Sequence, residues 1–208
     1  MDADPPDVLP ALGAPAPDLE LPDTHGTPVR LSALRGAPAL VVFVPFAFTR
    51  VCTGELAALQ DACGGAADDG GASDGGVGAL GRVSEPGAAA GPRSGSGSGL
   101  ASAATLPARD VARSAATLDG ARVLAVSCDP VFTLRAWAEQ EAFGFDLLSD
   151  FWPHGAAARA YGVFDPATGH ARRGTFLVDA DGVLRWSVLS PGGAPRDVAD
   201  YRAAIAAL

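Results

Sequence analysis

The residues with the most chemistry to offer are three cysteines, Cys52, Cys63 and Cys128, because a thiolate is a strong nucleophile. Cys52 lies in the first turn of a helix predicted over 52–63, directly after a loop. The backbone N–H groups of a first helical turn are unpaired and the helix dipole is positive there, so an ionised sulfur is favoured. Cys52 is therefore the predicted nucleophile.

The loop before Cys52 carries two residues that can act on the sulfur. The chain reads Pro-Phe-Ala-Phe-Thr-Arg-Val-Cys from Pro45 to Cys52, and it follows the apolar run 39–44. Pro45 ends a predicted strand and can cover the sulfur from bulk water. Thr49 offers a hydroxyl one turn before the sulfur and is the predicted N-cap of the helix.

Two further residues, Glu55 and Arg173, complete the pattern. Pro-x-x-x-Thr-x-x-Cys, with the glutamate three residues later and the arginine in a downstream Arg-Gly-Thr-Phe-Leu-Val strand, resembles the active-site signature of the peroxiredoxins. The segments 145–155 and 160–164 are most similar to the one-cysteine group typified by alkyl hydroperoxide reductase E. The resemblance implies an enzyme that uses a thiol to reduce hydrogen peroxide, organic hydroperoxides or peroxynitrite, through a cysteine sulfenic acid.

The resemblance also implies a role for each residue of the pattern. Cys52 is the peroxidatic cysteine, and Pro45 shields it. Thr49 hydrogen-bonds the peroxide and the thiolate, and Arg173 fixes both and stabilises negative charge. Glu55 orients an arginine behind them. A free thiol is a few per cent thiolate at neutral pH, so complete ionisation raises its reaction rate only some tens-fold. Enzymes typically supply ~10⁶-fold or more, so hydrogen-bond donors that stabilise the transition state are also needed.

The sulfenic acid must be reduced again, and the sequence leaves its partner open. Cys63 lies 11 residues from Cys52 along the predicted helix. That is about 16 Å at 1.5 Å per residue, whereas disulfide Cα atoms lie within roughly 7 Å. Cys128 follows a strand expected beside 39–44 and is the better internal resolving candidate, unless it is an inert thiol at a strand end. The resemblance instead implies an external thiol, mycothiol with mycoredoxin or thioredoxin, and a homodimer.

The elements that must position these residues alternate between strands and helices. Two apolar runs predict buried parallel strands that lie side by side, at 39–44 and 122–127. The alternation favours an α/β layered sheet, and the resemblance specifies a thioredoxin-like fold with an N-terminal β-hairpin extension. The other predicted elements are hairpin strands at 18–21 and 28–31, a short turn or helix at 32–36, a strand at 145–149, a hairpin over 174–188, and helices over 131–143, 152–161 and 199–208.

The 208 residues suit one domain with an interruption. Residues 1–13 are predicted to be a flexible leader and 14–208 the peroxiredoxin domain. A glycine- and serine-rich stretch without aromatic residues, about 64–104, predicts a disordered, low-complexity insertion. A weak helical period over 107–118 predicts that the interrupted helix resumes there.

Composition excludes several classes of protein. A net charge of −9 disfavours nucleic-acid binding, which needs a basic face. The acidic, proline-rich start is unlike a secretory signal, and no apolar run approaches the ~18 residues of a membrane span, so a cytoplasmic location without a membrane partner is expected. The three histidines are scattered without metal-ligand spacing, and no cofactor or metal is implied.

Two other functions compete with the peroxidase. A peroxide sensor that passes oxidation to a partner protein is motivated by the insertion, which peroxiredoxin folds do not usually carry at that place. A thiol–disulfide oxidoreductase on the same fold is disfavoured, because the chain has no Cys-x-x-Cys motif.

Overall fold

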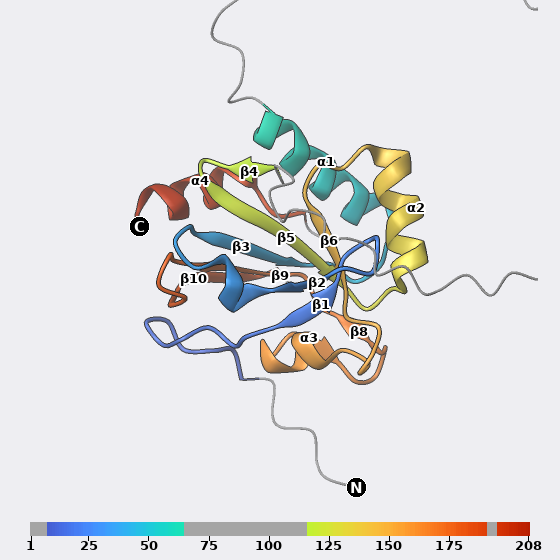
Figure 1. The fold of residues 1–208 in the computed structure, drawn as a ribbon, viewed down its shortest axis with the longest axis horizontal. Coiled ribbons are helices and arrows are strands. Elements are labelled where there is room, and N and C mark those ends of the chain that lie inside the picture. The colour runs from blue at the N-terminus through green and yellow to red at the C-terminus, as the bar shows by residue number, and fades with distance from the viewer. Residues whose placement is uncertain (1–7, 65–115, 191–194) are drawn as a thin grey trace, which may run out of the picture. The chain divides into compact units, whose positions relative to one another are not determined.

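A computed structural model describes residues 8–64, 116–190 and 195–208. These residues form a central six-stranded sheet in the order β10–β9–β3–β5–β4, with β6 also paired to β5 (Figure 1). Strands β3, β5 and β6 are parallel, whereas β4, β9 and β10 run antiparallel to their neighbours. The strands are β3 (Ala39–Phe43), β4 (Thr117–Leu118), β5 (Ala121–Ser127), β6 (Asp146–Ser149), β9 (Gly174–Val178) and β10 (Leu184–Leu189).

Both faces of this sheet are covered, which explains why every residue of β3 is buried. Helices α1 (Arg50–Gly64), α2 (Val131–Glu141) and α4 (Val198–Ala206) lie on one face (Figure 1). The N-terminal hairpin of β1 (Glu20–Pro22) and β2 (Pro28–Arg30) lies on the other face with α3 (Ala156–Ala160). The remaining elements are the 3-10 helix η1 (Leu31–Leu34) and the short pair β7 (Phe164–Asp165) and β8 (His170–Ala171).

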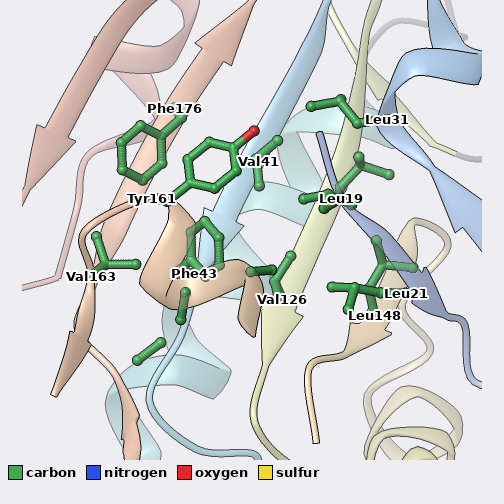
Figure 2. Close-up of a cluster of buried hydrophobic side chains, with 14 of the residues drawn as sticks. Leu19, Leu21, Leu31, Val41, Phe43, Val126, Leu148, Tyr161, Val163 and Phe176 are labelled. Atoms are coloured by element: carbon green, nitrogen blue, oxygen red, sulfur yellow. The ribbon is translucent and has the colours of Figure 1, made fainter. Parts of the chain in front are cut away.

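The sheet separates two hydrophobic cores, because alternate side chains of a strand point to opposite faces. The core between the sheet and α3, here called the α3-side core, contains Val41 and Phe43 of β3. The core between the sheet and α1, here called the α1-side core, contains Leu40 and Val42. Figure 2 shows the α3-side core, in which the Phe43 ring centroid lies 5.2 Å from that of Tyr161.

Most predicted elements are confirmed. The runs 39–44 and 122–127 are the parallel neighbours β3 and β5, in a register that places Val41 opposite Leu124. The N-terminal hairpin is present as β1 and β2, and the predicted hairpin over 174–188 is β9 and β10. The closing helix begins at Val198, where the Asp197 side chain accepts a hydrogen bond from the Ala199 N–H.

The prediction of a resumed helix up to Leu118 is wrong at its end. Thr117 and Leu118 form β4, which pairs with β5 through a two-residue turn at Asp119 and Gly120. Both turn residues have positive φ, 47° and 85°, which is the conformation that an Asp-Gly hairpin turn requires. The Asp-Gly signal was therefore present in the sequence, but the weak helical period obscured it.

One other boundary differs from the prediction. The helix expected over 152–161 is confined to α3, because residues 151–155 form turns around Pro153. Within the predicted leader, the Gly13 N–H donates to the Leu184 carbonyl over 2.7 Å. A flexible leader over 1–13 and a domain over 14–208 stay predictions. The rest of the predicted leader, the insertion at 65–104 and the segment 107–115 lie outside the described residues.

Candidate active site

Cys52 lies in the first turn of α1 and contacts an arginine from far along the chain. The Nη2 of Arg173 donates to the Cys52 sulfur over 3.4 Å, across 121 residues of sequence. The sheet explains this contact. Arg173 directly precedes β9, whose Gly174 lies opposite Phe43 of β3, so it reaches the end of β3 where the chain turns into α1. The structure thus brings together the two residues on which the predicted site depends.

A buried cluster of charges surrounds this contact. The Glu55 Oε2 lies 3.3 Å from the Arg173 Nε and 3.1 Å from the Arg196 Nη2. The side chains of Glu55, Arg173 and Arg196 are only 4%, 12% and 2% exposed. A buried charge is costly unless it is paired, so the two guanidinium groups stabilise the Glu55 carboxylate inside the protein. The same cluster places a cationic donor, Arg173, against the Cys52 sulfur.

Arg196 is a component of the site that sequence reasoning missed. Its Nη1 donates to the carbonyls of Phe43 and Gly174 over 3.0 and 2.9 Å, and to the Thr175 hydroxyl over 3.0 Å. Its backbone N–H donates to the Glu55 Oε1 over 2.8 Å. Arg196 therefore fixes Glu55 to the ends of β3 and β9. The only sequence signal was the acidic residue itself, which on the buried face of a helix needs a cationic partner.

The loop of residues 45–49 lies at the start of α1, as predicted. Pro45 is half-buried and follows Val44, which packs in the same core as Cys52. Thr49 directly precedes α1, in the predicted N-cap position, and its hydroxyl donates to the Phe46 carbonyl over 3.4 Å. The Thr49 carbonyl accepts from the Thr53 N–H over 2.8 Å and so begins the hydrogen bonding of the helix.

The sulfur is enclosed in this conformation, because Cys52 is 0% exposed. Enclosure excludes water, which strengthens the electrostatic effect of Arg173 on the sulfur. It also means that an oxidant reaches the sulfur only when neighbouring side chains move.

The other two cysteines differ from Cys52 in their surroundings. All three are free thiols. Cys128 packs in the α3-side core and Cys52 in the α1-side core, so the sheet lies between them. Burial, with a smaller effect of the Asp150 charge, raises the pKa of Cys128 to about 12, and burial raises the pKa of Cys63 to about 11. Neutral thiols are poor nucleophiles, and the resolving role of Cys128 stays a prediction.

The described residues contain no group of three or more His, Cys, Asp or Glu side chains placed to hold a metal ion. Within the same ranges, none of the helices combines the length and the apolar character that crossing a membrane requires.

Comparison with known proteins identifies the family of the chain. The sequence model of the AhpC/TSA family matches residues 12–72 and 104–187. The chain belongs to the AhpC/TSA family. The unmatched stretch between the two matches lies within the predicted insertion. The chain is therefore a peroxiredoxin, a thiol-dependent peroxidase, as the resemblance implied.

Individual relatives agree with this assignment. The peroxiredoxin is 36% identical over 198 residues to alkyl hydroperoxide reductase E of Mycobacterium tuberculosis, covering 95% of this chain and 97% of that protein. It is 35% identical to alkyl hydroperoxide reductase C of Staphylococcus aureus over 82 residues, which are 38% of this chain and 42% of that protein. The predicted likeness to the reductase E group is confirmed.

Solved structures confirm the thioredoxin-like fold of this peroxiredoxin. The crystal structure of peroxidoxin BcpB from Mycobacterium tuberculosis superposes with a TM-score of 0.64 at 24% identity, covering 95% of this chain and 97% of that one. The structure of Enterococcus faecalis AhpC gives a TM-score of 0.62 at 21% identity, covering 94% and 91%.

Proposed function

We propose that this peroxiredoxin reduces hydroperoxides by direct attack of the Cys52 thiolate on the terminal peroxide oxygen. The observation that carries the proposal is the 3.4 Å contact between the Arg173 guanidinium and the Cys52 sulfur. A new S–O bond forms as the O–O bond breaks. The sulfur is oxidised to a sulfenic acid, and the departing alkoxide or hydroxide takes a proton and leaves as alcohol or water.

Each residue around the sulfur has a separate role in this step. Arg173 holds the thiolate and donates to the oxygen on which charge builds as the O–O bond lengthens. Thr49 donates to the peroxide, and Pro45 limits the access of water to the sulfur. Glu55 keeps Arg173 in place, being itself tied to the sheet by Arg196. Because Cys52 is enclosed, we infer that side chains of the 45–49 loop move aside to admit hydrogen peroxide, an organic hydroperoxide or peroxynitrite.

An external thiol completes the cycle. It condenses with the sulfenic acid to a mixed disulfide and water, and a second thiol releases Cys52. Mycothiol with mycoredoxin, or thioredoxin, has the required chemistry. The location of Cys128 on the opposite face of the sheet supports an external reductant over an internal one.

We also infer a cytoplasmic homodimer. Three free thiols fit a reducing compartment. Phe132 and Trp152 are 76% and 80% exposed, so association of two copies through either side chain would remove apolar surface from water. Sedimentation at micromolar concentration tests the dimer, which a monomeric mass would contradict.

One experiment tests the peroxidase chemistry. The reduced protein is mixed with one equivalent of hydrogen peroxide, and the intact mass is measured together with the peroxide that remains. The expected result is fast loss of peroxide and a gain of one oxygen, both abolished in Cys52→Ser. Cys63→Ser and Cys128→Ser are matched controls that should behave as the parent. A loss of two hydrogens instead would indicate an internal disulfide, and an active Cys52→Ser would refute the proposal.

A further inference from the structure

The side chains of the loop of residues 45–49 hold it only in part, through Phe46, whose ring centroid lies 4.4 Å from that of His170, and Phe48, whose ring centroid lies 6.2 Å from that of Trp137. Both phenylalanines are well exposed, Phe46 by 44% and Phe48 by 47%. Phe48 also has a φ of 60°, in the left-handed region that a bulky side chain rarely adopts. Backbone in such a conformation persists only where the surrounding structure holds it.

In the described parts of the chain, one hydrogen bond ties the middle of this loop to a distant residue. The Ala47 N–H donates to the Oδ2 of Asp129 over 2.8 Å. Asp129 lies 82 residues away, between β5 and α2. The other bond within the loop is local, from the Thr49 hydroxyl to the Phe46 carbonyl. Besides the ring contacts of Phe46 and Phe48, the Asp129 carboxylate therefore fixes the backbone in the middle of the loop.

Asp129 is itself held by the ends of two strands. The Ser127 hydroxyl donates to the Asp129 Oδ2 over 2.5 Å and accepts from the Asp129 N–H over 3.2 Å. The Ser149 hydroxyl donates to the Asp129 carbonyl over 2.6 Å. Both serines are 2% exposed and lie opposite each other where β5 and β6 end. The carboxylate thus connects a rigid edge of the sheet to the strained loop.

We propose that Asp129 is a positioning residue of the peroxidase reaction. Through the Ala47 N–H it sets where Pro45 and Thr49 lie relative to the Cys52 sulfur. This inference rests on the proposed function. A displacement of about 1 Å at reacting groups can cost about 10²-fold in rate, so loss of the bond should slow peroxide reduction at least about tenfold.

Three variants of the full-length chain test this role. Asp129→Ala removes the acceptor, whereas Asp129→Asn keeps an amide oxygen that can accept from Ala47. Asp146→Ala is the matched control, because Asp146 is also a half-buried carboxylate that accepts two hydrogen bonds, from Arg122, but lies at the other end of β6. For each variant, the rate constant with hydrogen peroxide, the alkylation rate of Cys52 by iodoacetamide and the amide exchange of the peptide spanning 45–49 are measured well below the melting temperature.

We expect Asp129→Ala to lose at least about tenfold in peroxide rate and to exchange the loop amides faster, with Asp129→Asn recovering most of both. Alkylation should be unchanged, because the contact between Arg173 and Cys52 does not involve Asp129. A folded Asp129→Ala with the parent's rate overturns the proposal, as does an equal loss in Asp129→Asn or in Asp146→Ala. A parent that consumes no peroxide overturns the proposed function itself, so the two failures are distinguishable.

Discussion

Replacing Arg173 with Met should raise the activation free energy of peroxide reduction by more than it lowers the free energy of unfolding. Replacing Arg196 with Met should lower the free energy of unfolding by more than it raises that activation free energy. The comparison is matched, because both guanidinium groups are largely buried and both pair with the same oxygen of Glu55. They differ in one respect that matters for chemistry. Arg173 contacts the Cys52 sulfur, and Arg196 contacts the strands behind it.

The Arg173→Met change removes a donor from the reacting atoms. Deleting one donor aimed at developing charge typically costs about 10²–10³-fold in rate, or about 2.7–4 kcal/mol of transition-state stabilisation. Glu55 keeps its ion pair with Arg196, at 3.1 Å, so the carboxylate is not left without a partner. The effect on the free energy of unfolding should therefore be the smaller of the two.

The Arg196→Met change removes the residue that joins Glu55 to the sheet. Breaking a buried ion pair from one side costs about 3–5 kcal/mol, and here the carbonyls of Phe43 and Gly174 also lose a donor. Arg173 keeps its contacts with both Glu55 and the Cys52 sulfur in this variant. The expected loss in rate thus stays below about tenfold, which corresponds to about 1.4 kcal/mol.

Two measurements decide between these expectations. Single-turnover kinetics with hydrogen peroxide give the rate constant, and urea denaturation gives the free energy of unfolding for the parent and both variants. The reasoning is refuted if Arg173→Met stays within about tenfold of the parent, or if Arg196→Met is slowed as much as Arg173→Met while still folded.

Two further predictions concern stability. Since burial raises the pKa of Cys128 to about 12 and of Cys63 to about 11, both from an ordinary 9.0, the folded chain keeps protons that the unfolded chain loses above pH 9. The free energy of unfolding, followed by urea titration, should thus fall above pH 9, and a double Cys→Ala variant that falls as steeply would contradict this. In thermal melts with limited proteolysis, Gly162→Ala should lower Tm and expose the N-terminal segment, because φ is 66° and the added Cβ would lie 2.5 Å from the Val8 carbonyl oxygen. Gly54→Ala, a helical site with open space, is the control and should stabilise by about 0.5–1 kcal/mol.

Local residue types were sufficient to predict much of the sheet and the place of Cys52. A continuous apolar run at 39–44 makes a strand buried on both faces, and the following Pro45 and Thr49 lead into the helix that carries the cysteine. These features depend on neighbours in sequence. The contact between Arg173 and Cys52 was anticipated only through the family resemblance, because no local rule relates two residues 121 positions apart.

The tertiary structure alone decided the features that depend on which strands pair and which face a side chain takes. Arg196 and Asp129 join the site through contacts across 141 and 82 residues, and neither carries a periodic pattern. The order β9–β3–β5 brings their loops to one edge. Cys128 packs on the opposite face of the sheet from Cys52. Because successive residues of a strand point to opposite faces, a shift of one residue in strand register would reverse the face that each side chain takes. A sequence specifies local conformation through adjacent residues, but the pairing of distant segments emerges only when the whole core packs.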